Sequence, residues 1–524
     1  MNGLMVVKAG TKRIVAEAAI VPLQDFSTAT YERGPDRHAM GVEAGSRIEE
    51  AGLWFKPVIA SASCMTGSGY SRGFASLQAR RMLLPVVLLA SITAAASATP
   101  ARLVDIRTAS AVDITAAKSA PGVQWWLELG DELLLAGDAS APTSMPVERT
   151  FADLPLERLT VRSIGCASRS EAAGEVIARG GRWQLRALSP GTAMPAPMDT
   201  SERWRAVAAN ETLARQYRLD ASLAAPSDPT IQPIVDSIDT QRWFDDLSHL
   251  ATWDRSSYGT TDLFAARDWI GEQFAATGLT VSMEDFTMPG NSGSITRQNI
   301  IGTWTGTAHP DEWIVVGGHY DSRNENLHST TNAPGAEDNA SGCAGVIEMA
   351  RALVPAHPER TFVFMCYAGE EQDLYGSYAH VDDLTSQGNL SKVKAVVVMD
   401  MIGYSADAHL DADYESYASL QPYLNRFGAA AATYAPDLHI VFQTNPWGSD
   451  HVPYLEAGVQ TVLGIESDYD DYPDYHSTTD IPANIGPFAQ AMGGAILKTN
   501  VAVLADIGGA HIIDDHIFVD GWDG

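Results

Sequence analysis

Polar side chains of the types that bind metals or move protons follow three apolar runs in the second half of this 524-residue sequence. His319 and Asp321 close the run WIVVGGHYD, Glu370 and Glu371 close TFVFMCYAGEE, and Asp400 closes AVVVMD. Open α/β sheets bind ligands at the carboxyl ends of their strands, because loops there project several side chains into one crevice. We therefore predict that these three places contribute to a single site.

The predicted site holds more carboxylates than a buried pocket tolerates without a cation. A single acidic residue after a strand is commonly a turn former or a helix cap. An adjacent pair such as Glu370 and Glu371 is costly to bury unless positive charge balances it. Imidazole and carboxylate ligands without thiolate suit zinc, whereas calcium prefers oxygen cages. Two ions about 3.5–4 Å apart need a carboxylate between them, and we predict Asp338 for that bridge.

Apolar runs and helical patterns alternate around these residues. Helical spacing extends from Thr261 to Thr277, and Gly278 is a plausible stop. Further along, apolar runs at 313–316, 361–367 and 395–399 alternate with helical stretches at 341–353 and 376–384. This order predicts an α/β fold in which a mostly parallel mixed sheet is flanked by helices.

Residues 99–226 show short apolar runs broken by glycine, proline and serine, as at Trp125–Leu129 and Trp183–Leu188. This pattern predicts a small β-rich accessory domain before the main one. The stretch AAPSDP at 224–229 has linker composition, so we place the boundary at residue 226. The predicted catalytic domain then spans 227–507, and 508–524 form an acidic C-terminal tail.

An export signal lies at an unusual distance from the first residue. Arg80 and Arg81 precede an apolar run that leads into small residues ending at Ala98, which is the pattern of a cleaved signal peptide. The run is shorter than the roughly 20 apolar residues of a membrane-spanning helix. We predict a signal peptide at 65–98, a non-native or disordered extension at 1–64, and a periplasmic or secreted protein without a stable membrane anchor.

Charge and cysteine usage exclude other classes of protein. The formal net charge of -30 would repel a phosphate backbone, so nucleic acid is not an expected partner. The four cysteines include no C-x-x-C pair and indicate no disulfide framework. Cys343 and Cys366 stand in apolar runs, where we expect small buried side chains rather than metal ligands.

Five sequence blocks resemble the M28 zinc peptidases, a family whose aminopeptidase members include the bacterial leucine aminopeptidases. The resemblance covers roughly Val235 to Asp506, and all five blocks occur in the family's order. They are GGHYDS around His319, GAEDNASG from 335, AGEEQDLYGS from 368, VMDMIGY from 398 and DYHSTTD from 474.

The resemblance implies a metal ligand set. His319 and Asp400 resemble the terminal ligands of one zinc ion, and Glu371 and His476 resemble those of a second. Asp338 and a water or hydroxide would bridge the two ions. The implied activity is hydrolysis of the N-terminal peptide bond of peptides that carry a free N-terminus.

The resemblance also implies two residues that act without binding metal. Glu370 is similar to the family's general base, which takes the proton of the attacking water and passes it to the leaving amine. Asp321 is similar to a carboxylate that fixes the tautomer of His319. The sequence departs from some relatives before Ser449, where no tyrosine stands to stabilise the oxyanion, although Tyr454 or Tyr404 could substitute for it.

Three alternative functions remain open at this point. A carboxypeptidase of similar fold would clamp a substrate carboxylate with arginine, and Arg323 is close in sequence to the ligands. A glutaminyl cyclase-like enzyme would use one zinc, which fits the full ligand set less well. A non-catalytic binding module is disfavoured because no predicted metal ligand is missing.

An acidic loop at 468–475 could attract the protonated N-terminus of a peptide substrate.

Overall fold

The structure is a computed structural model that describes residues 4–9, 12–17, 98–138, 145–164, 173–180, 183–195, 202–217, 226–469 and 471–512. Strands β1 (Leu4–Ala9) and β2 (Lys12–Glu17) pair as an antiparallel hairpin within a unit of their own, Met1–Ser91. Most of the predicted extension at 1–64, the predicted signal peptide at 65–98 except Ala98, and the tail beyond residue 512 lie outside the described residues. These predictions therefore stay predictions.

Strands form most of the described part of residues 99–226. They are β3 (Ala101–Asp105), β4 (Val123–Gly130), β5 (Glu132–Gly137), β6 (Val147–Phe151), β7 (Leu159–Ile164), β8 (Glu175–Gly180), β9 (Trp183–Ala187), β10 (Glu202–Ala206) and β11 (Glu211–Gln216), with one helix, α1 (Ala111–Lys118). Strands β7 to β10 form an antiparallel sheet in the order β10-β7-β9-β8. Strand β11 instead pairs with β18 of the following region, so a separate accessory domain ending at 226 stays a prediction.

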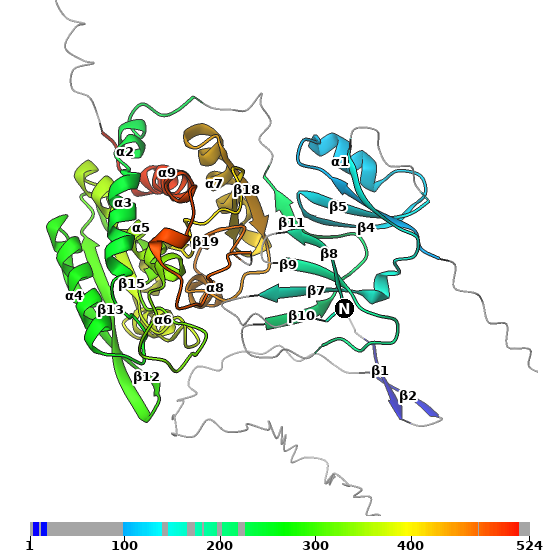
Figure 1. The fold of residues 1–524 in the computed structure, drawn as a ribbon, viewed down its shortest axis with the longest axis horizontal. Helices are drawn as coiled ribbons and strands as arrows, with labels where there is room; N and C mark the ends of the chain where they lie inside the picture. Colours follow the sequence, from blue (N-terminus) through cyan, green and yellow to red (C-terminus); the bar gives the residue numbers. More distant parts are fainter. Residues whose placement is uncertain are drawn as a thin grey trace, which may run out of the picture. The chain divides into compact units, whose positions relative to one another are not determined.

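The region after residue 226 alternates strands with helices (Figure 1). Its strands are β12 (Thr280–Gly290), β13 (Gly293–Trp304), β14 (His309–His319), β15 (Arg360–Tyr367), β16 (Val393–Met399), β17 (Leu410–Glu415), β18 (Leu438–Gln443) and β19 (Thr461–Glu466). Its helices are α2 (Gln232–Asp236), α3 (Thr240–Leu250), α4 (Thr261–Ala276), α5 (Ser341–Leu353), α6 (Tyr375–Ser386), α7 (Gln421–Tyr434), α8 (His451–Glu456) and α9 (Ala489–Gly508).

These strands form one mixed sheet in the order β12-β13-β15-β14-β16-β19-β17-β18, which continues through β11 into β4, β5, β3 and β6. The pairs β14–β15, β14–β16, β16–β19 and β17–β18 are parallel, and β12–β13, β13–β15 and β17–β19 are antiparallel. The predicted fold class, a mixed sheet flanked by helices, is confirmed, with the parallel strands at its centre.

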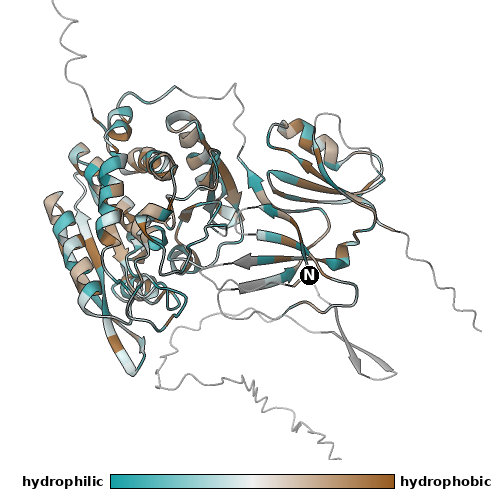
Figure 2. Ribbon diagram, viewed as in Figure 1, coloured by the Kyte–Doolittle hydropathy of each residue, from teal (hydrophilic) through white to brown (hydrophobic). Residues whose placement is uncertain are grey.

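Alternate residues of the central strands enter two different apolar cores. In β15, Phe362 and Phe364 pack into a core with α3, α4, α5 and α9, whereas Val363 and Met365 pack into a second core with α6 and α8. A strand covered on both faces must be apolar at every position, which explains the unbroken run TFVFMCY. In Figure 2 the helices over the sheet carry both hydrophilic and hydrophobic residues, as expected for elements that bury only one side.

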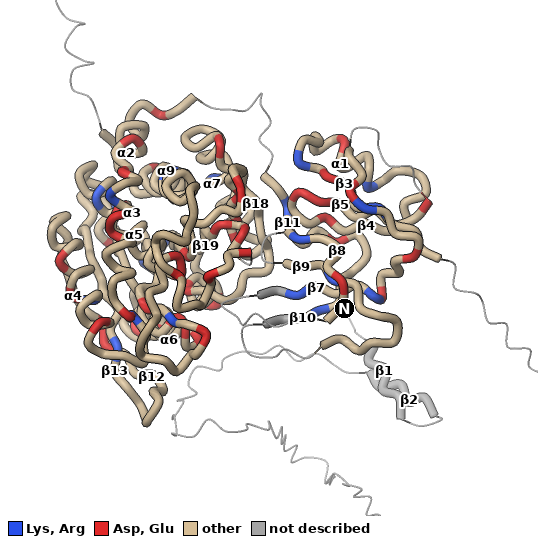
Figure 3. The backbone as a smooth tube through the Cα atoms, viewed as in Figure 1, with Lys and Arg blue, Asp and Glu red and all other residues tan. Residues whose placement is uncertain are grey.

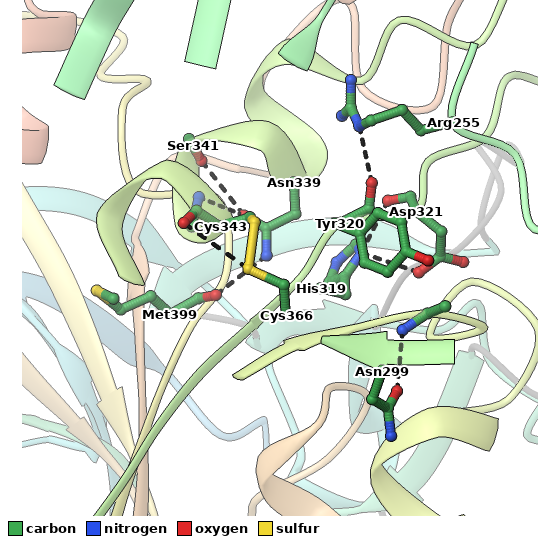
Figure 4. The surroundings of a disulfide bond; sticks show 12 residues. Arg255, Asn299, His319, Tyr320, Asp321, Asn339, Ser341, Cys343, Cys366 and Met399 are labelled. Atoms are coloured by element: carbon green, nitrogen blue, oxygen red, sulfur yellow. Dashed lines mark hydrogen bonds and ion pairs between the residues drawn. A yellow bond between two sulfur atoms is a disulfide. The ribbon is translucent and has the colours of Figure 1, made fainter. Parts of the chain in front are cut away.

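A disulfide between Cys343 and Cys366 ties helix α5 to strand β15 (Figure 4). The cysteine pattern indicated no disulfide framework, so the sequence did not predict this bond. The two cysteines are 23 positions apart in sequence, but Cys366 points from β15 toward the face that α5 covers, and the Cα atoms are 5.8 Å apart. Only the packing of the helix on the sheet brings the two sulfur atoms together. The expectation that both side chains are buried is confirmed.

Removing this cross-link should destabilise the protein. The bond closes a loop spanning 23 positions, and a loop of that length predicts a loss of about 3 kcal/mol in the free energy of unfolding. We expect a lower urea midpoint for the Cys343→Ala/Cys366→Ala variant than for a Cys166→Ala control. Equal midpoints, together with three free thiols instead of one in the unfolded Cys166→Ala control, would contradict the cross-link.

Across the residues that the structure covers, no helix is both long enough and apolar enough to span a bilayer.

Candidate metal centre

The edge of the sheet where β14, β15 and β16 end carries the residues that the sequence singled out. His319 is the last residue of β14, Asp400 directly follows β16, and Glu370 and Glu371 follow β15 after a two-residue gap. Because these three strands are parallel neighbours, their carboxyl ends lie together. The predicted convergence at one edge is therefore observed.

Glycines before His319 allow its strand to pack closely. A Cβ atom on Gly317 would lie 2.5 Å from the ring of Tyr367, and one on Gly318 would lie 2.9 Å from the carbonyl oxygen of Met399. Side chains larger than hydrogen would push the neighbouring strands away. The GGH sequence thus holds the histidine deep in the sheet, where its side chain is fully buried.

The predicted ligands form two buried groups. In the first, His319 Nε2 lies 3.3 Å from Asp400 Oδ1 and 3.8 Å from Glu370 Oε2. In the second, His476 Nε2 lies 3.2 Å from Glu371 Oε2. His476 belongs to the loop after β19, so it reaches the site from a segment far away in sequence.

Asp338 lies between the two groups. Its Oδ1 is 3.3 Å from His319 Nε2, and its Oδ2 is 2.8 Å from His476 Nε2. The residue stands in the segment Ala336–Ala340, immediately before α5, where its own backbone departs from helical geometry. A carboxylate that turns one oxygen toward each group is placed as a bridging ligand would be.

Several buried polar atoms in these groups form no hydrogen bond, and their types show whether the residues fit metal ions. His319 Nε2, His476 Nε2, both oxygens of Asp338 and of Glu371, and Oδ1 of Asp400 are buried and form no hydrogen bond. A buried polar atom without a hydrogen bond costs free energy, so such atoms usually bind a water molecule or an ion, or have a functional role. Their types, imidazole nitrogen and carboxylate oxygen, are those of a zinc site. The donor set therefore fits two such ions.

The electrostatics of the site also call for cations. Burial raises the pKa of Glu370 well above its ordinary value, and the charges of Asp400 and Glu371 raise it further against the opposing effect of His319. Burial and the charge of Asp338 likewise raise the pKa of Glu371, while His476 lowers it. Cations between these groups would favour the ionised carboxylates and offset the cost of burying them.

Asp321 approaches His319 with its backbone carbonyl more closely than with its carboxylate. The backbone carbonyl oxygen of Asp321 lies 3.0 Å from His319 Nδ1, whereas its carboxylate Oδ1 lies at 3.7 Å. A carbonyl can only accept, so Nδ1 carries the proton and Nε2 presents its lone pair to the site. The carboxylate instead accepts from Ser257 Oγ at 2.8 Å and from the backbone N–H of Glu370 at 3.3 Å. It positions the segment that carries the predicted base.

Three supporting residues were missed at the sequence level. Ser449 donates to Asp400 Oδ2 at 2.7 Å. Asp480 accepts from the backbone N–H groups of Glu337 and Asp338, and so holds the predicted bridging residue in place. The buried guanidinium of Arg255 donates to four backbone carbonyl groups, including that of Tyr320 beside the predicted ligand His319 (Figure 4). Asp480 ends the DYHSTTD block, and Ser449 marks the point where the sequence departs from some relatives. The spacing of the residues, however, did not predict the hydrogen-bond partners of either side chain.

The tyrosines considered as oxyanion helpers are engaged elsewhere. The hydroxyl of Tyr454 lies 2.7 Å from that of Tyr367 in the apolar core against α6. The ring of Tyr404 packs against that of Tyr472, with centroids 4.8 Å apart. The oxyanion role therefore stays unassigned.

The acidic loop at 468–475 was expected to attract a protonated N-terminus. In this loop, Asp471 forms an ion pair with Arg179 of β8 at 2.8 Å.

The bond from Ser449 to Asp400 leads to a testable expectation. Residues that hold metal ligands from outside the coordination shell typically contribute about 10- to 100-fold to metal affinity. We expect Ser449→Ala to weaken zinc binding by that factor in a chelator competition titration. A Ser386→Ala variant, which changes an exposed serine on α6, should bind zinc like the wild type. Equal affinity of both variants would show that the bond does not support the ligand.

Comparison with known proteins supports the resemblance. Residues 299–499 match the model of "Peptidase family M28". A "Probable zinc metalloprotease" of Pyricularia oryzae is 35% identical over 164 residues, which are 29% of this chain and 32% of that protein. One of Pyrenophora tritici-repentis is 28% identical over 263 residues, covering 41% and 59% of the two proteins. This chain thus matches between a third and three fifths of these relatives' length.

Solved structures that align with part of this chain include a zinc aminopeptidase and a glutaminyl cyclase. The zinc aminopeptidase from Bacillus subtilis aligns with 53% of this chain and 96% of its own, at 17% identity and a TM-score of 0.45. The glutaminyl cyclase of Macrostomum lignano aligns with 56% of this chain and 97% of its own, at 18% identity and a TM-score of 0.47.

Proposed function

We propose that this chain, which contains a peptidase family M28 domain at residues 299–499, is an exported aminopeptidase that uses two zinc ions. The observation that carries the proposal is the placement of Asp338, whose two carboxylate oxygens face two separate buried groups. His319 and Asp400 would hold one ion, and Glu371 and His476 the other. The matched relatives named zinc metalloproteases support the choice of metal.

The chain's own residues divide the work of hydrolysis. When bound, the ions would polarise the scissile carbonyl and make a water molecule acidic enough to ionise near neutral pH. Glu370 is buried at the edge of the first group, 3.8 Å from His319 Nε2, the longest of the carboxylate distances to that atom. That distance leaves it available to accept the proton of the attacking water and deliver it to the leaving amine.

Negative charge around the site favours a substrate with a free amine. The buried carboxylates of Asp338, Glu370, Glu371 and Asp400 surround the two histidines, and burial raises the pKa of neighbouring Asp450 to about 7. A protonated N-terminus is attracted to such a surface, whereas a substrate carboxylate is repelled. We expect peptides with a free N-terminus as the substrates.

A carboxypeptidase activity is the second candidate, because a guanidinium lies beside the ligands. Arg323 Nε is 3.9 Å from Glu371 Oε2, and its side chain is 14% exposed. An arginine at this place could bind a terminal carboxylate. We rank it second because its pairing with Glu371 occupies the positive charge. A glutaminyl cyclase-like enzyme with one zinc ranks third, since the candidate metal centre offers two groups of donors.

Export is supported by an observation apart from the signal-like stretch at 65–98. A buried disulfide joins Cys343 and Cys366, and stable disulfides form mainly in proteins that leave the cytosol. We propose a periplasmic or secreted location with no nucleic acid partner and no stable membrane anchor. N-terminal sequencing of the native protein would test the signal, because a mature terminus upstream of Arg80 would contradict it.

The decisive experiment compares amino-acid anilides and short peptides blocked at either end. We expect the zinc-loaded protein to cleave substrates with a free N-terminus and to leave acetylated ones intact, whether or not the C-terminus is amidated. Equal cleavage of acetylated substrates would overturn the aminopeptidase proposal. Cleavage that requires a free C-terminus would favour the carboxypeptidase, and ring closure of N-terminal glutamine would favour the cyclase.

A further inference from the structure

A second cluster of metal-binding side chains lies on strands β17 and β18, apart from the candidate metal centre. It consists of His409, Asp411 and His439, whose donor atoms all lie within 4.8 Å of one another. Strands β17 and β18 are parallel, and Asp411 stands directly opposite His439 in their register. His409 precedes β17 by one residue, so the strand pairing itself brings the three side chains together.

The two imidazoles present the same kind of atom to the cluster. Nδ1 of His409 lies 2.8 Å from Asp411 Oδ2 and 3.2 Å from Nδ1 of His439. The ring centroids are 3.9 Å apart. Only one proton can occupy the space between two nitrogens at that distance, so at least one lone pair points into the cluster. Asp411 Oδ1 is buried, forms no hydrogen bond and lies 3.5 Å from His439 Nδ1.

The surroundings of the cluster are acidic. Asp131, Asp411, Asp468 and Asp471 line one hollow together with Arg179, and acidic residues gather near β18 and β19 in Figure 3. The nearby carboxylate of Asp411 raises the pKa of His439, the charge of Asp131 adds to that effect, and burial and Arg107 oppose it. The field therefore favours a cation at this place.

From this arrangement we propose that His409, Asp411 and His439 bind a divalent transition-metal ion such as zinc. Two imidazole nitrogens and one carboxylate leave room for water as a fourth ligand of a tetrahedral ion. Imidazole donors disfavour calcium and magnesium, which prefer oxygen ligands. The side chains are 34%, 22% and 40% exposed, so an ion can enter from solvent.

A bound ion would fasten two loops at this edge. The segment before β17 is held by a bond from the backbone N–H of Ala406 to Asp468 Oδ2, at 2.9 Å. The backbone N–H of Ser467 donates to the carbonyl of Asp411, also at 2.9 Å. The loop that follows Ser467 leads to His476. The ion is therefore expected to stabilise the fold locally and to leave the ligands of the candidate metal centre in place.

The test measures metal content by mass spectrometry after the full chain is equilibrated with zinc and freed of unbound ion. We expect the His409→Ala/His439→Ala variant to hold one zinc fewer per chain than the wild type. The His309→Ala control changes an exposed histidine elsewhere and should match the wild type. Because the comparison is a difference, it does not depend on how many ions the candidate metal centre binds.

Two further measurements keep the outcome clear. If the double variant does not fold, an Asp411→Asn variant can replace it, because asparagine keeps the size of the side chain and removes its charge. This variant should bind the extra ion at least tenfold more weakly than the wild type. Cobalt should give a visible absorption band that is weaker in the cluster variants than in the wild type, because those variants keep only the ions of the candidate metal centre. Equal zinc content in the wild type and the cluster variants would overturn the proposal and leave a hydrogen-bonded cluster. Equal loss in His309→Ala would overturn it as well.

Discussion

Replacing Glu370 by glutamine is expected to lower kcat by a factor of about 10²–10⁴, the usual contribution of a positioned general base, while zinc content stays that of the wild type. The amide keeps the shape of the side chain but cannot accept a proton. Glu370 is buried beside the first group, so no solvent molecule takes its place readily. Initial rates on an amino-acid anilide, measured together with metal content, check this expectation.

Glu371 provides the matched control, because it is the adjacent residue with the same side chain. Glu371 Oε2 lies 3.2 Å from His476 Nε2, so Glu371→Gln should lower zinc affinity first and activity as a consequence. Excess zinc should then restore part of the activity of Glu371→Gln but none of that of Glu370→Gln. If Glu370→Gln loses zinc instead, its side chain is a ligand and the assignment of the base is wrong.

Replacing Asp338 by alanine is expected to remove both zinc ions and to lower activity by more than about 100-fold, since even residues outside the coordination shell contribute 10- to 100-fold. Its two oxygens face His319 and His476 at 3.3 and 2.8 Å. Terminal ligands behave differently, because losing one of them affects mainly one ion. Zinc per chain, counted by mass spectrometry, distinguishes the two cases.

The control for this variant is Asp437→Ala, which removes an exposed aspartate before β18. It should keep the metal content and activity of the wild type. Loss of a single ion in Asp338→Ala would show that the carboxylate serves one group only. Wild-type zinc content in Asp338→Ala would contradict the proposed centre altogether.

The sequence alone predicted the central elements well. The helix expected at 341–353 is α5, the run at 361–367 lies within β15 and the run at 395–399 lies within β16. These patterns are legible because each element buries a repeating set of side chains, which leaves a local period in the sequence. The polar residues that end an apolar run can also be recognised from the local sequence. The convergence of His319, Glu371 and Asp400 could thus be inferred from strand order.

Contacts between distant segments could not be inferred in this way. Cys343 and Cys366 were expected to be separate buried residues, yet the packing of α5 on β15 joins them. Asp321 was expected to orient His319 through its carboxylate, but its backbone carbonyl makes that hydrogen bond. The type of a residue does not show which hydrogen bonds its backbone forms, and the presence of a cysteine does not show which other cysteine it pairs with.

What the sequence by itself determined is the chemistry available: which donor types stand at the ends of which strands, and the kind of fold that places those ends together. Tertiary structure decided the geometry, because the orientation of Asp338 depends on Asp480, 142 residues away, and that of Asp400 on Ser449, 49 residues away. The same holds for His409 and His439, which meet only through the pairing of β17 with β18. Local patterns record burial, whereas the direction of a side chain is set by whichever distant group packs or bonds against it.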